Sequence, residues 1–62
     1  MARRFKLKST TFVTDPKIDW LRSGGPFVGE VNPRRTEVVR LIDPADPNNW
    51  YEVTMNEVDE VP

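Results

Sequence analysis

The sequence contains no cysteine and no histidine, and only one tyrosine. Without cysteine there is neither a disulfide nor a thiolate nucleophile, and without histidine there is no imidazole base near neutral pH. Together these absences exclude a Ser-His triad and a zinc site built from Cys and His. The remaining acids and bases are Asp, Glu, Lys and Tyr51. We therefore expect a protein that is not an enzyme and that binds no cofactor.

Long hydrophobic runs are also missing. No apolar stretch approaches the ~20 residues of a membrane-spanning helix, and the first residues lead into an alternating segment that is unlike a signal peptide. The lack of cysteine is compatible with a reducing compartment. We expect a cytoplasmic protein without membrane contact, folded as a single domain over residues 1–62.

The sequence does contain a series of short segments typical of β-strands. Apolar and charged residues alternate from Arg4 to Lys8, which predicts a long, bent first strand over about residues 3–14. A bulge near residues 9–11 would return Phe12 to the core. Gly29 stands in the middle of the second strand, where it indicates a bend or a close approach of two backbones. The other strands are expected over residues 27–31, 36–42, 50–55 and 58–61.

The connections between these strands differ in character. Asp15 and Pro16 suit the start of a helical turn and Gly24 suits its end, which predicts one or two turns over residues 15–23. Residues 32–35 predict a turn, and residues 43–49, with two Asp-Pro steps, predict a loop. The oxygen-bearing side chains of that loop lack the glycine and the distal glutamate of a calcium loop. We expect no metal site there.

The order of these elements resembles the SH3-like barrel architecture. A long first strand is followed by a long loop with a helical turn, three closely spaced strands and a short last strand. The resemblance is one of topology over most of the chain and includes no sequence signature of a family. It implies a mainly β fold, a small five-stranded SH3-like barrel, whose closure would remove exposed strand edges.

Charge is distributed unevenly along the chain. Residues 1–22 contain six cations and two acids, whereas residues 43–62 contain six acids and no cation. One interpretation is that the two ends lie side by side and neutralise each other. The other is that a basic face meets an anionic partner.

The candidate contact residues are two tryptophans and a set of cations. Trp50 shares its strand parity with Glu52 and Thr54, which predicts that its ring lies outside the barrel. Trp20 falls in the long loop. Exposed tryptophans are typical interface anchors, although either ring could instead cover an end of the barrel. The partner-binding residues that we predict are Trp50, Trp20, Arg34 and Arg35, and those that could contact nucleic acid are Arg3, Arg4, Lys6, Lys8, Arg34 and Arg35.

Three functions remain open at this point. The first is a small binding module that docks on a larger protein, such as a phage-encoded modulator or a small accessory subunit, acting as a monomer or a small homo-oligomer. The second is a nucleic-acid-binding barrel that uses the basic N-terminal strand together with Arg34 and Arg35. The third is a self-assembling structural subunit that gains stability through Trp50 and its edge strands.

Overall fold

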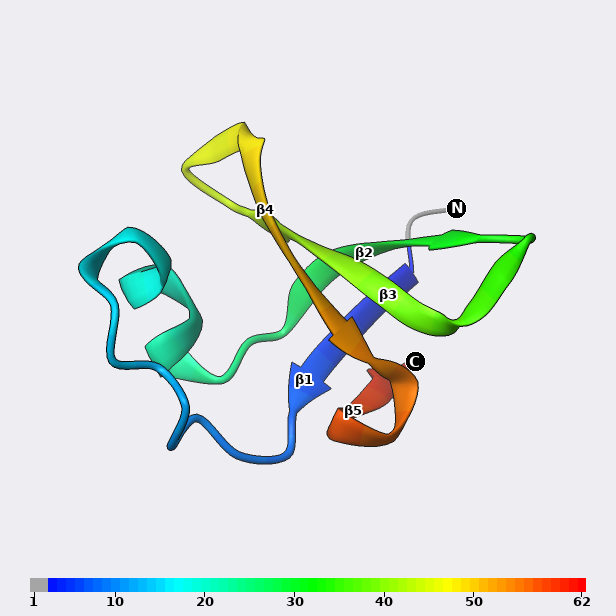
Figure 1. Ribbon diagram of the computed structural model, residues 1–62, viewed down its shortest axis with the longest axis horizontal. Coiled ribbons are helices and arrows are strands. Elements are labelled where there is room, and N and C mark those ends of the chain that lie inside the picture. Colours follow the sequence, from blue (N-terminus) through cyan, green and yellow to red (C-terminus); the bar gives the residue numbers. More distant parts are fainter. Residues whose placement is uncertain (1–2) are drawn as a thin grey trace.

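A computed structural model describes residues 3–62 and shows a mainly β protein (Figure 1). All five strands belong to one antiparallel sheet, in the order β4-β3-β2-β1-β5. The elements are β1 (Arg3–Leu7), the 3-10 helix η1 (Pro16–Ser23), β2 (Phe27–Asn32), β3 (Arg35–Asp43), β4 (Asp46–Thr54), the 3-10 helix η2 (Met55–Glu57) and β5 (Val58–Val61).

The order and type of the elements agree with the sequence prediction, but the predicted closure into a barrel is wrong. β4 and β5 are the two edges of the sheet, and within residues 3–62 they do not pair with each other. The single 3-10 turn of η2 follows directly after Thr54 and redirects the chain. β5 then pairs antiparallel with β1, from Leu7 opposite Val58 to Arg4 opposite Val61. The sheet therefore keeps one long open edge, at β4.

The core lies on one face of this sheet. Alternate side chains of the strands point into it, and the long connection between β1 and β2 covers it with Val13 and Leu21. Figure 1 shows this connection and η1 to one side of the sheet, opposite the β2–β3 hairpin. The buried side chains are Phe5, Leu7, Val13, Leu21, Phe27, Val39, Leu41, Val53 and Val58.

The first strand is shorter than predicted, because it ends at Leu7 and not near residue 14. The backbone N–H of Lys8 still donates to the carbonyl of Glu57 at 3.0 Å, but the chain then turns, with the N–H of Val13 donating to Thr10 at 3.0 Å. Phe12 reaches the core through this turn and not through a bulge. It is half-buried and stacks on Tyr51, with 5.8 Å between the ring centroids.

The predicted helical turn is confirmed, including its caps. Asp15 accepts a hydrogen bond from the backbone N–H of Lys17 at 2.9 Å, and Pro16 occupies the first turn. Gly24 has a φ of 82°, in the left-handed region that favours glycine, and its N–H donates to Leu21. These caps hold the helix in the position where Leu21 is fully buried.

The predicted loop over residues 43–49 is a tight hairpin instead. The carboxylate of Asp43 accepts hydrogen bonds from the N–H of Ala45 at 2.8 Å and from the Asn49 amide at 3.2 Å, and thereby fixes the turn locally. β4 consequently begins at Asp46. The register shifts between the Ile42–Trp50 and Asp43–Asp46 pairs, so residues 47–49 of β4 form an irregularity within the hairpin.

Gly29 lies at a close approach, but of two side chains and not of two backbones as the sequence predicted. A Cβ atom at this position would lie 2.5 Å from the Phe5 ring and 2.8 Å from the Val39 side chain. Since Phe5 and Val39 are both fully buried, neither has free space to retreat into. This contact brings β1, β2 and β3 together at the centre of the core.

We therefore expect Gly29→Ala to lower the free energy of unfolding by about 1–3 kcal/mol, the usual cost of overpacking a core. Urea denaturation measures the effect. Phe5→Leu provides the control, because a smaller side chain opposite position 29 makes room for the added methyl group. The cost of Gly29→Ala should be lower in the Phe5→Leu background than in the parent. Equal costs in both backgrounds would contradict this account.

Candidate functional site

The face of the sheet that points away from the core carries an apolar row. Val28 in β2 and Trp50 in β4 are the exposed large hydrophobic residues of the described chain, with 44% and 45% of their surface accessible. Ile42 of β3 is half-buried, pairs with Trp50, and lies one residue beyond the Gly29–Leu41 pair that joins β3 to β2. We call Val28, Ile42 and Trp50 the outer apolar row.

Arg40 lies beside this row and covers the Trp50 ring. Its guanidinium carbon is 4.0 Å from the centroid of the indole. Arg40 stands between Glu30 and Glu52 in the strand register, yet within residues 3–62 it forms no ion pair with either. The arginine therefore holds the exposed ring in place by a cation–π contact.

A charged hollow of about 240 Å³ adjoins the row on the same side of the sheet. Arg35 contacts Glu37 at 3.4 Å and Glu52 at 3.7 Å, while no ion pair in residues 3–62 includes Glu30. The hollow is lined by Glu30, Val31, Asn32, Arg35, Val38, Arg40 and Glu52. The outer apolar row thus has a charged border in which Glu30, although opposite Arg40 in the register, forms no ion pair within residues 3–62.

Trp50 lies where the strand parity predicts, outside the core, whereas Trp20 lies elsewhere. The Trp20 ring packs edge-on against Phe27, with the centroids 5.2 Å apart, and is half-buried against the core. Its Nε1 is buried, and no atom of residues 3–62 accepts a hydrogen bond from it. The two tryptophans therefore do not share one surface, and a contact role for Trp20 stays a prediction.

The cations of the N-terminal segment are partly neutralised by the acidic last strand. Arg3 donates two hydrogen bonds to the Glu60 carboxylate, at 2.8 and 2.9 Å, and Lys8 lies 3.8 Å from Asp59. Arg4 donates to the carbonyl of Pro62 at 3.2 Å. The interpretation that the two ends of the chain lie side by side is therefore confirmed for this part of the basic set.

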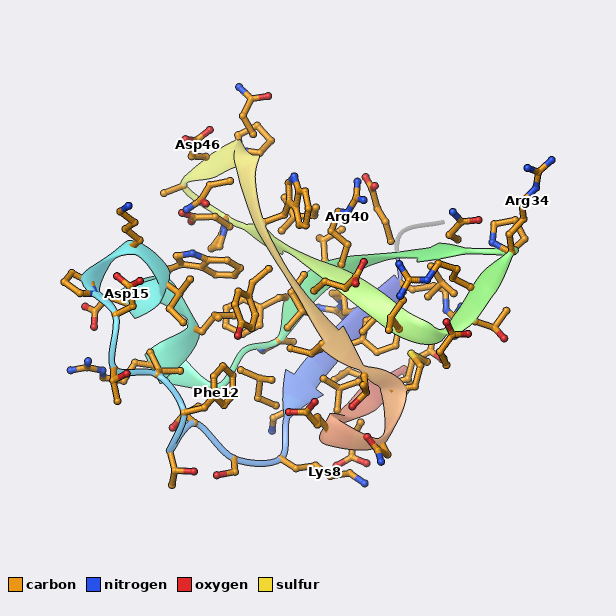
Figure 2. The ribbon with its side chains drawn as sticks, viewed as in Figure 1. Lys8, Phe12, Asp15, Arg34, Arg40 and Asp46 are labelled. Atoms are coloured by element: carbon orange, nitrogen blue, oxygen red, sulfur yellow. The ribbon has the colours of Figure 1, made fainter. Side chains whose placement is uncertain are left out.

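The remaining predicted cations lie apart from one another. Arg34 projects from the tip of the β2–β3 hairpin, far from Lys8 at the end of β1 (Figure 2). Arg35 belongs to β3 and is held by carboxylates, so the predicted turn presents one arginine and not two. Lys6 lies opposite Asp59 in the strand register.

Sequence reasoning did not identify Val28, Ile42 or Arg40 as part of this site. The signal was present, because Val28 has the opposite parity to buried Phe27, and Ile42 shares the parity of Arg40. Only the strand register shows that these side chains lie on one surface.

Two further findings concern side-chain clusters and helix length in the part of the chain that the structure describes. No group of three or more metal-binding side chains occurs among residues 3–62. None of the helices there is long and apolar enough to cross a bilayer. Comparison of the chain with family models, with curated protein sequences and with solved structures found no match.

The Arg3–Glu60 pair makes stability depend on pH in a defined direction. The hydrogen bonds from Arg3 lower the pKa of the Glu60 carboxyl in the folded protein. A lowered pKa stabilises the fold at pH values above the ordinary range of a glutamate, and this contribution is lost as the pH falls through the lowered pKa. Glu60→Gln should therefore lower the melting temperature slightly at neutral pH and leave it unchanged in strong acid.

The matched control is Arg3→Gln, which removes the other partner. The double variant should melt at the temperature of the less stable single variant, because both substitutions remove the same interaction. Additive losses would show that the two side chains act independently. The effect is small because both groups are exposed to solvent.

Proposed function

We propose that the chain is a non-catalytic binding module that docks on a larger protein through the outer apolar row and Arg40. The observation that carries this proposal is the location of Val28 and Trp50, the exposed large hydrophobic residues of the described chain, on one face of three adjacent strands. Neither side chain packs in the core. Their burial would contribute to the stability of a complex instead.

The Arg40–Trp50 contact supports the same role. Tryptophan and arginine are the residue types most enriched among interface positions that contribute strongly to affinity. An indole that is already held by a guanidinium at 4.0 Å loses less side-chain freedom when a partner covers it. The pair therefore favours binding without a change in the fold.

Together, the outer apolar row and its charged border have the composition that is typical of a protein interface. Neighbouring strands lie about 4.8 Å apart, so the outer apolar row spans only ~10 Å across β2, β3 and β4. Stable interfaces have an apolar centre and a polar rim that together bury ~800 Å² on each partner. The charged hollow and the β2–β3 hairpin supply that rim.

We also infer an SH3-like arrangement of strands, in the form of an open sheet. The strand order, the long first connection with its 3-10 helix and the single 3-10 turn before β5 support it. A phage-encoded modulator or a small accessory subunit is a role that suits such a module.

Nucleic acid is the second candidate partner, and the ion pairs of the fold speak against it. Arg3, Lys8 and Arg35 each contact a carboxylate of the chain itself. If phosphate contacts nevertheless carry binding, Arg34→Ala combined with Arg35→Ala should weaken the binding of all sequences about equally and reduce the salt dependence. Fluorescence anisotropy with single- and double-stranded oligonucleotides at low salt measures this. An absence of binding to both would exclude the second candidate.

Trp50→Ala tests the favoured function. We expect a loss of affinity of about 2 kcal/mol or more, which is roughly 30-fold, and a smaller loss of stability of ~0.5–1 kcal/mol for an exposed cation–π contact. A photo-crosslinking residue at position 28 identifies the partner in cells, and calorimetry with that purified protein gives the affinity. The melting temperature of the variant is measured in parallel.

Lys17→Ala is the matched control, because Lys17 is exposed on η1 and outside the outer face. It should retain the affinity of the parent. A Trp50→Ala variant that is folded and binds as tightly as the parent would contradict the proposal. An unfolded variant would show that Trp50 serves the fold instead.

A further inference from the structure

The open edge of β4 is a second feature of the same surface. β4 has nine residues, compared with four in β5 at the other edge of the sheet. In residues 3–62, no backbone hydrogen bond from outside the sheet reaches β4. Proteins usually protect a strand edge of this length, because its N–H and C=O groups can pair with another chain.

The strand register identifies the backbone groups at this edge. The N–H of Thr54 donates to the Glu57 side chain at 3.4 Å and so points away from β3. In an antiparallel pair, successive residues alternate between bonding to the neighbouring strand and pointing away from it. The N–H and C=O groups of Trp50 and Glu52 therefore also face the open edge, while those of Tyr51 and Val53 bond to β3.

Trp50 and Glu52 also present their side chains on the outer face of the sheet. A strand added at this edge would lie beside Trp50 and Glu52 on that face, and beside half-buried Tyr51 on the other. The recognition surface would then combine a backbone ladder with side-chain selection at alternate positions.

The charge of the edge indicates what kind of strand it accepts. Residues 43–62 contain six acids and no cation, and Asp46 and Glu52 both lie in β4. A second copy of β4 would bring the same acids to the same edge, which is unfavourable. A basic side chain opposite Glu52 is favourable, and an apolar side chain opposite Trp50 extends the outer apolar row.

We propose that β4 binds an extended segment of the partner protein as a sixth strand of the sheet. The segment carries a lysine or arginine opposite Glu52 and, two residues away, an aromatic or β-branched side chain opposite Trp50. This inference rests on the proposed function, because it names the chemistry of the partner at the same face. It adds that the main chain of Glu52, and not only side chains, takes part in binding.

Backbone methylation separates the two contributions. A chain of 62 residues is accessible to chemical synthesis, so a methyl group can be placed on the nitrogen of Glu52 without a change of side chain. This N–H faces the open edge, and we expect an unchanged fold and melting temperature. The matched control is N-methylation of Val53, which removes a donor to β3 and should destabilise the sheet.

The probe is a displayed library of short random peptides, selected on the parent protein. We expect the selected peptides to share a lysine or arginine two residues from an aromatic or β-branched residue. Their affinity, measured with purified peptides, should fall at least about tenfold when Glu52 is N-methylated, which corresponds to the loss of an interfacial hydrogen bond. Selection on Glu52→Lys should replace the basic residue by an acidic one.

Each alternative outcome would show which part of the proposal is wrong. Peptides that lose affinity with Trp50→Ala but not with N-methyl Glu52 would overturn strand addition and leave docking on the outer face intact. A selection that enriches no peptide would also overturn strand addition, whereas the crosslinking experiment at position 28 would still test the proposed function. Dimers in sedimentation that disappear on N-methylation of Glu52 would show that the occupant is a second copy, contrary to this proposal.

Discussion

The packing of the Phe5 ring on Gly29 is the contact on which the rest of the fold depends. The Phe5 ring of β1 lies so close to Gly29 of β2 that a Cβ atom there would clash with it and with the Val39 side chain of β3. Because Phe5 is fully buried there, the inward parity of all three strands is set. The outward parity then follows, and it brings Val28, Ile42 and Arg40 to one face.

At the edge of the sheet formed by β5, ion pairs accompany the pairing of the strands. The last strand adds to β1 and brings acids of the C-terminal third to cations of the first strand, as in the Arg3–Glu60 and Lys8–Asp59 pairs. These contacts are exposed and individually weak. They place Arg3 and Lys8 against carboxylates of the chain itself, while the acids of β4 lie at the opposite, open edge of the sheet.

Local signals in the sequence predicted the elements whose structure is decided locally. Asp15, Pro16 and Gly24 define η1, and the parity of Trp50 placed its ring outside the core. The predictions that failed have different causes. The pairing of the first strand stops after Lys8 bonds to the distant Glu57, which no local pattern shows, whereas the tight hairpin was missed although the Asp43 carboxylate fixes it locally through Ala45 and Asn49. Barrel closure failed because nothing in the spacing of strands shows which edges meet.

The candidate site was predictable only in part for the same reason. Trp50 is visible from its own strand, but its neighbours come from two other strands, and only the register shows that Arg40 stands between Glu30 and Glu52. With Arg40 turned over the indole, no ion pair within residues 3–62 includes Glu30, and the Glu52 main chain faces the open edge. The exposed Trp50 ring, the Glu52 carboxylate and the free backbone groups of β4 all lie at the open edge of the sheet. An extended basic and apolar segment contacts all three at once, which is why we favour a protein partner over nucleic acid.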